Sequence, residues 1–279
     1  MEMLVSVLVN NYNYSRFLNQ CIDSILSQSY RSIEIIVYDD GSNDDSIETL
    51  ANYEDSIKVI ANQNFGSFPS FNQANAINQS FFASKGEIIF LLDSDDFFHP
   101  EKVARVVQEF ISNPDVLLVQ DSAFLFVDGK VVGNHNSAST AFDYKALYYK
   151  HNWTAYYNPT SNLSFRRQYL HDVLPLKMDA LWRVWPDVRL SRLVPFFGQV
   201  RSIPEPFTYY RRHSSNDSAA MNKRPVNALK NQYAHHVFVN RHLKLMGNKP
   251  LAFLISIPFL KYVMKILIPR FALKIKLKK

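Results

Sequence analysis

Two aspartates placed one residue apart, Asp93 and Asp95, follow an apolar run at Glu87–Leu92. Carboxylates with this spacing at the end of a strand can share a hard divalent cation such as Mg²⁺ or Mn²⁺, which keeps coordination positions open for phosphate oxygens. A cation there would absorb the charge that develops on a departing diphosphate. The alternative is a solvated acidic turn that caps the following helix. An EF-hand calcium loop is excluded, because the positions that require Gly and Glu are Phe98 and Ala104.

Polar residues also follow three other strand-like runs. Asp40 comes after Ile33–Tyr38, where a carboxylate can accept a hydrogen bond from the N–H of a nucleotide base, with a helix cap as the alternative. Tyr12 could stack on that base or pack against the protein. Asn10 and Asn64 follow the first and third runs. Because ligands of a parallel sheet bind beyond the carboxyl ends of its strands, these residues are expected to converge with the acids.

A glycine-rich phosphate loop is missing, since Asn10–Tyr14 contains no Gly. Neither G-x-G-x-x-G nor a P-loop motif follows the first run. This argues against a dinucleotide-dependent dehydrogenase and against a P-loop kinase, and it leaves a metal-held diphosphate as the natural alternative. Cys21 lies in an apolar helical stretch that is typical of a core, so it is not expected to act as a nucleophile.

The elements that would hold these residues alternate between strand-like and helix-like segments. The strand-like runs are Val5–Val9, Ile33–Tyr38, Ile57–Ala61, Glu87–Leu92 and Val116–Gln120. The segments with helical spacing are Phe17–Leu26, Asp44–Tyr53, Ser70–Ala83 and Pro100–Ile111. This alternation predicts an α/β fold with a mostly parallel sheet and helices on both faces. Further along, Phe124–Val132 predicts a hairpin around Asp128-Gly129, and helical spacing returns after about residue 226.

Charge divides the chain into an acidic body and a basic tail. Residues 218–279 hold 13 Lys and Arg and no acid, which leaves 18 Lys and Arg against 25 Asp and Glu in residues 1–217. The overall net charge of +6 therefore says little about the body and gives weak support for nucleic-acid binding. The single cysteine cannot form an internal disulfide and fits a reducing compartment.

The tail ends in the segment LAFLISIPFLKYVMKILIPRFALKIKLKK, which is apolar with spaced cations. Such a segment can lie in a membrane interface with its cations near anionic headgroups. The alternative is a helix that packs on the body while its lysine stems cover apolar surface. No uninterrupted apolar stretch is long enough for a conventional transmembrane helix, and the N-terminal run has neither the basic leader nor the cleavage site of a signal peptide.

Four longer segments carry a family signature: SVLVNNYNYSRFLNQCIDSILSQSY, IEIIVYDDGSNDDS, NQNFGSFPSFNQANAINQSFFASKGEIIFLLDSDD and YYRRHSSNDS. In order and spacing, over about residues 3–217, they resemble glycosyltransferase family 2, whose members have the GT-A fold. The resemblance implies transfer of a sugar from a nucleotide diphosphate donor, usually with inversion and with Mg²⁺ or Mn²⁺. The implied fold is a mostly parallel central sheet with helices on both faces, followed here by a basic helical extension.

The resemblance also assigns roles to residues. Tyr12 and Asp40 should hold the base, Asp93 should lie near the ribose and the metal, and Asp95 should bind the metal directly. The catalytic base should be Asp187, which takes the acceptor proton on the side opposite the diphosphate, with Asp179 as the fallback. Pro186 stands where the family usually has Glu before that base. Phe71 stands where many members carry an Arg shortly before the residue matching Asn72, which leaves the donor open.

The remaining candidates each have a functional and a structural interpretation. His213 is expected to contact the metal or the diphosphate, with an ordinary surface histidine as the alternative. Arg211 is assigned to the acceptor side of the cleft, where it could contact phosphate. Aromatic residues suit the apolar face of a pyranose ring, although core packing is as good an account for any one of them: Trp153, Trp182 and Trp185. His235 and His236 are expected at the surface.

The sequence thus predicts a GT-A domain over residues 1–217, with a nucleotide-sugar half at 1–121 and an acceptor half at 122–217, and a membrane-associating extension at 218–279. The expected partners are a nucleotide-sugar donor, with UDP-sugars favoured, a glycan or lipid-linked acceptor, and the membrane surface, but no nucleic acid. The expected location is peripheral on the cytoplasmic face of the membrane, in surface polysaccharide assembly. The alternatives are a catalytically inactive scaffold of the same fold and a sugar nucleotidyltransferase.

Overall fold

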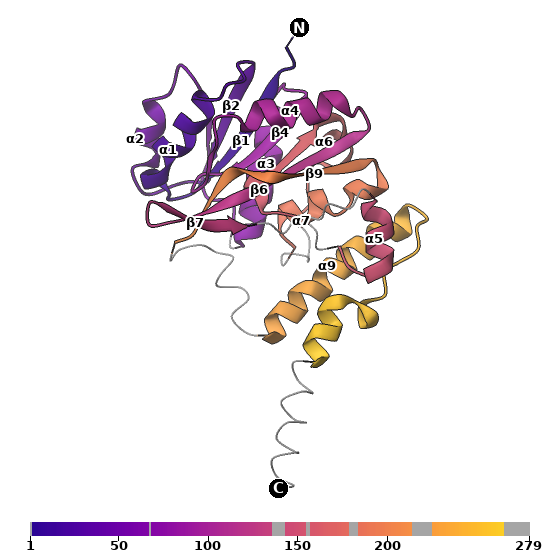
Figure 1. Cartoon of the computed structure of the whole chain (residues 1–279). Coiled ribbons are helices and arrows are strands. Elements are labelled where there is room, and N and C mark those ends of the chain that lie inside the picture. The colour runs from indigo at the N-terminus through magenta and orange to yellow at the C-terminus, as the bar shows by residue number, and fades with distance from the viewer. Residues whose placement is uncertain are drawn as a thin grey trace.

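The computed structural model describes residues 2–66, 68–135, 143–154, 157–178, 184–213 and 225–264. Its centre is a nine-stranded sheet with the strand order β3-β2-β1-β4-β8-β6-β9-β5, in which β7 pairs with β6 (Figure 1). The parallel part consists of β1 (Val5–Asn11), β2 (Ile33–Asp39), β3 (Lys58–Ala61) and β4 (Ile88–Asp93). The predicted strand-and-helix alternation of the first half is confirmed.

The second half extends this sheet with mixed strand directions. β8 (Leu163–Arg166) runs antiparallel to both β4 and β6 (Val116–Val127). β9 (Gln199–Arg211) runs parallel to β6. The short β5 (Phe97–Phe98) pairs antiparallel with β9. Through these pairings, β9 returns the chain to the segment that follows β4.

Helices cover both faces of the sheet, as predicted. On one face, buried residues of α1 (Ser15–Leu26), α2 (Ser46–Ala51) and α4 (Lys102–Ser112) form a cluster with alternate residues of the strands. On the other, the cluster takes in α3 (Pro69–Ala83), α5 (Tyr144–His151), α6 (Arg167–Val173) and α7 (Pro186–Ser191). Strand positions alternate between the two clusters because successive side chains point to opposite faces. Cys21 is fully buried in the first cluster.

The predicted hairpin is present between β6 and β7 (Lys130–His135). Its two turn residues, Asp128 and Gly129, both have positive φ, at 47° and 79°. This is the conformation that a two-residue hairpin turn of type I′ requires, and it explains why an Asp-Gly pair occupies the turn.

The C-terminal part contains α9 (Pro225–Leu245), the short turn η3 (Phe253–Ile255) and a helix at residues 257–264. Phe238, Val239 and Leu243 of α9 belong to the same core cluster as α5 and α7. In Figure 1, α9 lies below the sheet beside α5. Within the residues that the structure describes, no helix is long and apolar enough to cross a membrane.

The prediction that His235 and His236 lie at the surface is wrong. They are 8% and 3% exposed, because the face of α9 that carries them is turned toward the body. The ring of His236 stacks on Trp153, and its Nε2 lies 2.8 Å from the carbonyl oxygen of Asn152.

Candidate active site

The carboxyl ends of β1, β2 and β4 form one rim, as expected for a parallel sheet. Asn10 of β1 lies in register with Tyr38 on one side and Asp93 on the other. The backbone N–H of Asp40 donates to the carbonyl of Asn11 at 3.0 Å, and that of Ser94 donates to the carbonyl of Asn10 at 3.1 Å. The chain therefore leaves each strand at the same level, so that the polar residues after the strands face a common space.

One side of the rim is organised by Asp39, which the sequence reasoning did not single out. Its carboxylate accepts hydrogen bonds from the Asn11 amide at 2.7 Å, from the Ser42 hydroxyl at 2.7 Å and from the Ser42 backbone N–H at 2.8 Å. These bonds fasten the loop after β2 to the end of β1. Asp39 thus holds the loop, while the neighbouring Asp40, directly after the strand, bonds to the loop that follows β3.

The Asp40 carboxylate accepts hydrogen bonds from the Asn64 amide at 3.0 Å and from the Phe65 backbone N–H at 3.1 Å. Burial raises the pKa of Asp40, and the Phe65 bond partly offsets this. Gly41 beside it has φ +75°, and a Cβ there would meet the Asn64 nitrogen at 2.6 Å, so the turn requires glycine. Tyr12 is 43% exposed at this rim, which leaves its ring accessible to a ligand.

Two residues of α3 extend the rim. The Asn72 amide donates to the Asn64 side chain at 3.3 Å, and the Gln73 amide donates to Asp93 Oδ1 at 2.8 Å. Gln73 was not predicted, although it directly follows Asn72. The oxygen atoms of both side chains are buried and accept no hydrogen bond. Buried polar atoms without a partner are uncommon, and a group of them beside an acid is typical of a place where a ligand binds.

The acids after β4 form a tight cluster. Burial, with a contribution from the charge of Asp95, raises the pKa of Asp93 to about 7. Hydrogen bonds from the Gln73 and Asn10 amides act in the opposite direction and lower this pKa. Asp96, which the sequence reasoning left out, is buried and accepts a hydrogen bond from the Ser161 hydroxyl at 2.6 Å. Burial and the charges of Asp95 and Asp93 raise the pKa of Asp96 as well.

Two residues at and beyond the end of β9 meet this cluster. His213 Nε2 lies 2.9 Å from Asp95 Oδ2, which brings together two of the predicted metal ligands. Arg211 donates from Nε to the carbonyl of Asp95 at 2.6 Å and from its backbone N–H to Asp96 Oδ1 at 2.7 Å. Its guanidinium also stacks over Phe17 at 4.5 Å. Arg211 therefore lies at the acid cluster.

The side chains at this site fit a hard cation that takes some of its ligands from the protein and the others from a diphosphate. Asp95 and His213 each expose 11–12% of their side chains, so they are reachable from the rim. Neighbouring carboxyls that raise one another's pKa mark an excess of negative charge, which a cation would relieve. Among the described residues, no group of three or more His, Cys, Asp and Glu side chains is arranged to hold a metal by itself. Phosphate oxygens and water would complete the coordination of a cation on Asp95 and His213.

Asp187 lies in the first turn of α7, and its Oδ1 atom is buried without a hydrogen-bond partner. Burial raises the pKa of Asp187, whereas the backbone N–H of Val188 and the charge of Arg192 lower it. The charge of Asp187 in turn raises the pKa of Asp93. The predicted base therefore comes from the other half of the chain and lies near enough to Asp93 for its charge to act on that carboxyl.

A buried charged network lies behind the acids. Lys102 is fully buried and donates from Nζ to Asp121 Oδ1 at 2.8 Å, to the Ser161 carbonyl at 2.7 Å and to the Thr208 hydroxyl. Asp121 Oδ2 also accepts from Thr208 at 2.7 Å. Ser161, on the short turn η1 (Thr160–Asn162), accepts from the Asp93 N–H at 3.1 Å and donates to Asp96. The network thus supports the acid cluster. The sequence did not reveal it, because Lys102 lies in a stretch with ordinary helical spacing.

The predicted acceptor-side aromatic residues lie in different surroundings. Trp185 directly precedes α7, next to Asp187, and is partly exposed. Trp153 is 7% exposed and is held between His236, on which it stacks, and the guanidinium of Arg192 at 5.1 Å. These are the contacts of a packed side chain. Trp182 and the fallback base Asp179 lie outside the described residues.

Comparison with known proteins agrees with this fold. The family model "Glycosyl transferase family 2" matches residues 6–174, more than half of the chain. The chain therefore belongs to glycosyl transferase family 2, a family of transferases. It is 31% identical over 221 residues to an uncharacterised glycosyltransferase of Nostoc sp., a match that covers 77% of this chain and 66% of that relative.

Solved structures show the same fold at lower sequence identity. The mannosyltransferase PcManGT from Pyrobaculum calidifontis, in complex with GDP-Man and Mn²⁺, has a TM-score of 0.59 at 15% identity and covers 94% of this chain and 69% of its own. Residues 1–349 of S. aureus TarS, in complex with UDP, have a TM-score of 0.56 at 17% identity and cover 87% and 72%. The predicted GT-A fold is thereby confirmed.

Proposed function

We propose that this protein transfers a sugar from a nucleotide diphosphate donor to a hydroxyl group in a single displacement with inversion. The observation that carries the proposal is the Asp187 carboxyl, whose Oδ1 atom is buried without a hydrogen-bond partner and whose charge acts on Asp93 of the acid cluster. Inversion requires a base on the side of the anomeric carbon opposite the diphosphate, and a carboxylate from the second half of the chain suits that position.

In this proposal the rim of the sheet holds the donor. Tyr12 stacks on the base, Asp40 accepts a hydrogen bond from it, and the unpartnered oxygens of Asn72 and Gln73 accept from donor hydroxyls. Asp95 and His213 would bind Mg²⁺ or Mn²⁺ beside Asp93, and the bound cation would neutralise the charge that develops on the diphosphate. Structures of the same fold contain UDP or GDP-Man, and UDP-sugars are our first choice of donor.

Asp187 then acts on the acceptor. Its free oxygen accepts the proton of the acceptor hydroxyl, whose oxygen bonds to the anomeric carbon as the bond to the diphosphate breaks. Burial strengthens the carboxylate as a base by raising its pKa, and the Val188 N–H holds it in place without proton transfer. Cys21 takes no part, because it is fully buried and burial raises the pKa of its thiol.

The direct test is thermal stability in the presence of UDP, GDP, dTDP and CMP, each with and without Mn²⁺. A ligand at about 100 times its dissociation constant stabilises a protein by roughly 2.7 kcal/mol. We expect one nucleotide to stabilise the wild type in a Mn²⁺-dependent way and Asp95→Ala to lose this effect. Asp172→Ala, a change at an exposed acid on α6, is the matched control and should keep it. Stabilisation by none of the four would remove the donor assignment.

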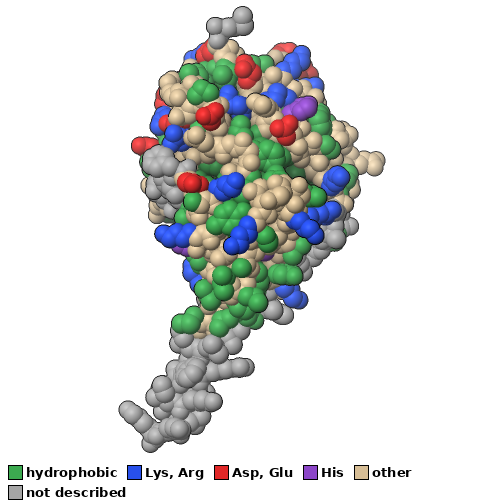
Figure 2. Space-filling model, turned by 90° about the vertical axis from the view of Figure 1, so that its right-hand side faces the viewer, with side chains coloured by type: hydrophobic (Ala, Val, Ile, Leu, Met, Phe, Trp, Pro, Cys, Tyr) green, Lys and Arg blue, Asp and Glu red, His purple; other side chains and the backbone are tan. Residues whose placement is uncertain are grey.

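We further propose that the protein works at the cytoplasmic face of a membrane, on a glycan or lipid-linked acceptor in surface polysaccharide assembly. The C-terminal part supports the membrane contact, because it exposes large apolar side chains among cations: Leu254 (67%), Ile255 (61%), Leu260 (50%) and Met264 (53%). In Figure 2, apolar side chains gather at this lower end of the molecule, and Lys and Arg surround them.

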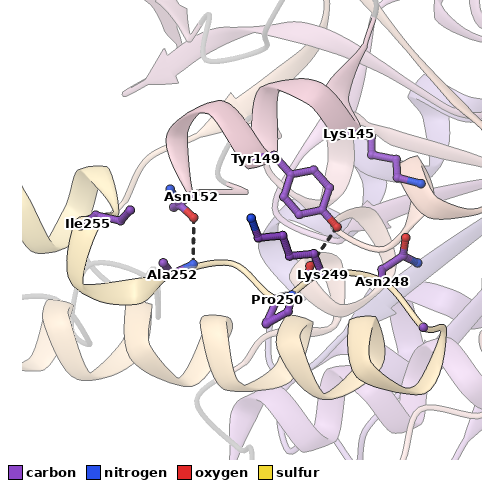
Figure 3. A pocket seen from close by; sticks show the side chains of 9 residues that line it. Lys145, Tyr149, Asn152, Asn248, Lys249, Pro250, Ala252 and Ile255 are labelled. Atoms are coloured by element: carbon purple, nitrogen blue, oxygen red, sulfur yellow. Dashed lines mark hydrogen bonds between the residues drawn. The ribbon is translucent and has the colours of Figure 1, made fainter.

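A shallow hollow of about 520 Å³ adds to this surface (Figure 3). Lys145 of α5 and Lys249 contribute its cations, and Ile255 lies at its edge. The Tyr149 hydroxyl donates to the Lys249 carbonyl at 2.9 Å, and the Ala252 N–H donates to the Asn152 side chain at 2.8 Å. These bonds fasten the start of the apolar segment to α5. Lys145 and Lys249 therefore lie on parts of the chain that are held together.

Deletion of residues 251–279 tests the membrane proposal. The full-length protein should sediment with vesicles that contain anionic phospholipid and much less with neutral vesicles, because attraction to anionic lipid adds about 1 kcal/mol per basic residue near the surface. The truncated protein should stay in the supernatant in both cases while keeping its nucleotide-dependent stabilisation. Equal sedimentation of the two proteins with anionic vesicles would disprove the proposal.

A further inference from the structure

His213 lies beyond the end of a strand, although its side chain is the proposed partner of Asp95 in metal binding. β9 ends at Arg211, and the backbone N–H of Arg212 donates to the carbonyl of Phe126 at 2.9 Å, so strand pairing fixes the chain up to that residue. His213 comes next, and its Nε2 still lies 2.9 Å from Asp95 Oδ2. The contacts of the His213 ring therefore indicate what holds it there.

Two aromatic residues at the start of α1 pack against the His213 ring. The Phe17 ring is tilted against it, with the ring centroids 5.1 Å apart. The ring of Tyr14, the residue directly before α1, meets it edge-on at 5.4 Å. Tyr14 and Phe17 also contact each other, with their centroids 5.7 Å apart. Aromatic rings attract each other at these separations and angles, so the imidazole is held by two rings that support one another.

The same helix holds Arg211, two residues before His213. The guanidinium carbon of Arg211 lies 4.5 Å from the centre of the Phe17 ring, a distance at which a cation is attracted to an aromatic face. Its Nη2 donates to Gln20 Oε1 at 2.6 Å, and its Nε donates to the Asp95 carbonyl at 2.6 Å. Arg211 thus joins α1 to the segment that carries the acids.

Tyr14, Phe17 and Gln20 follow one another at intervals of three residues and therefore lie on one side of α1, which we call the α1 cradle. The helix itself is anchored in the core by a row of buried residues: Leu18, Cys21, Ile22 and Ile25. Because the core fixes the helix, the α1 cradle is a fixed surface against which the end of β9 packs.

We propose that the α1 cradle, with Phe17 at its centre, positions His213 as a metal ligand beside Asp95. Phe17 is a positioning residue in this role, because it acts on the cation only through His213. Two neighbouring ligands of an octahedral ion such as Mg²⁺ lie about 3 Å apart when each is about 2.1 Å from the ion. His213 Nε2 and Asp95 Oδ2 already have this separation, and a shift of the imidazole would remove it. This inference rests on the proposed metal-dependent binding of the donor.

The first experiment measures Mn²⁺ binding in the presence of UDP, from the electron paramagnetic resonance signal of free Mn²⁺. Phe17→Leu keeps an apolar side chain but removes the ring, and it should weaken Mn²⁺ binding by about 10-fold, the low end of the usual loss for residues that orient metal ligands. Phe82→Leu, the same change at an exposed phenylalanine of α3, is the matched control and should bind Mn²⁺ like the wild type. Binding of UDP without Mn²⁺, measured by calorimetry, should be the same in all three proteins.

The second experiment shows whether Phe17 acts through His213. His213→Ala should itself weaken Mn²⁺ binding, and Phe17→Leu added to it should cause little further loss. In protein labelled with ¹⁵N-histidine, the electron spin echo of bound Mn²⁺ is modulated by a histidine nitrogen that binds it directly. We expect this modulation in the wild type and in Phe82→Leu, its loss in His213→Ala and its weakening in Phe17→Leu.

Gln20→Ala provides the test if Phe17→Leu does not fold. Gln20 is exposed, so its loss leaves the core intact, but it holds Arg211 against the helix. Gln20→Ala should weaken Mn²⁺ binding by about 2-fold, as expected for the loss of one exposed hydrogen bond.

The outcomes separate this inference from the function on which it rests. If Asp95→Ala and His213→Ala weaken Mn²⁺ binding while Phe17→Leu and Gln20→Ala do not, the α1 cradle only packs against the end of the strand and the inference is wrong. A full 10-fold loss when Phe17→Leu is added to His213→Ala would also overturn it, because Phe17 would then act by another route. If the wild type binds no Mn²⁺ with any of UDP, GDP, dTDP and CMP, the proposed function itself fails, and the inference fails with it.

Discussion

The two sides of the candidate site are built in different ways. On the donor side, the polar residues follow directly after neighbouring strands, and many of them bind one another: Asn11 to Asp39, Asn64 to Asp40, and Gln73 to Asp93. On the acceptor side, Asp187 keeps an oxygen without a partner, and its charged neighbour Arg192 is held from α9, 43 residues further along the chain.

This difference suggests different sources of precision. A parallel sheet sets the positions of strand ends by register, so a donor site can be made from short local motifs. A base on a short helix has no such register, and its position must come from packing and long-range contacts. The donor side should therefore lose function when a rim residue changes, whereas the acceptor side should also respond to changes at a distance.

The largest expected effect tests the support behind the donor side. Lys102→Met leaves Asp121 buried without its cation, and removal of one partner of a buried ion pair typically costs about 3–5 kcal/mol of unfolding free energy. Urea denaturation measures this cost. Lys130→Met on β7, at an exposed lysine, is the control and should change the unfolding free energy by less than about 0.5 kcal/mol.

A double variant sharpens the same prediction. Lys102→Met with Asp121→Leu removes both charges and should recover part of the loss, because no buried charge remains unpaired. If Lys102→Met alone lowers the unfolding free energy by less than about 1 kcal/mol, the Lys102–Asp121 ion pair does not hold the Ser161 turn in place beside the acid cluster.

The next effect concerns catalysis and separates the two sides. Asp187→Asn should reduce sugar transfer by a factor on the order of 10² or more, because the acceptor loses its base, while nucleotide-dependent stabilisation stays. Asp95→Ala should do the reverse and lose nucleotide binding itself. Transfer kinetics together with thermal stabilisation distinguish these patterns, and full transfer activity in Asp187→Asn would contradict the assignment of the base.

The same difference explains which parts could be predicted from the sequence. The strands β1 to β4, the helices between them and the acids at Asp93 and Asp95 were predictable because each depends on local periodicity and on residues next to a strand end. The rim acid Asp40 was found in the same way. Asp39 was missed because its role in holding the loop depends on Asn11 and Ser42, which only the folded sheet brings to it.

The acceptor side was less predictable for a physical reason. The surface assignment of His235 and His236 followed from a basic stretch without acids, but stacking on Trp153 and the hydrogen bond to Arg192 bury them. The support of the acids by Lys102 was equally hidden, since a lysine at helical spacing is usually solvated. Contacts between residues that belong to different helices and strands leave no periodic signal in the sequence.

The smallest expected effect compares the pH dependence of stability at one aspartate from each side. Asp44, near the donor rim, is hydrogen-bonded by the backbone N–H groups of Ser15 and Ser46. Burial alone would raise the pKa of Asp44, but these bonds and those of the serine hydroxyls lower it below 3.8. Its ionised form thus stabilises the fold above the unfolded pKa, and this stabilisation is lost as the pH falls through the folded value.

Asp187 has the opposite sign. Its pKa is raised above 3.8 in the fold, mainly by burial, so the unfolded chain ionises first and stability falls as the pH rises through this range. At pH 7, Asp187→Asn should therefore raise the unfolding free energy and Asp44→Asn should lower it, and both differences should vanish at a pH below the folded pKa of Asp44. Thermal unfolding from pH 2 to pH 8 measures both variants against the wild type. Destabilisation at pH 7 by Asp187→Asn would mean that its carboxylate is held for stability and is not kept free for the acceptor.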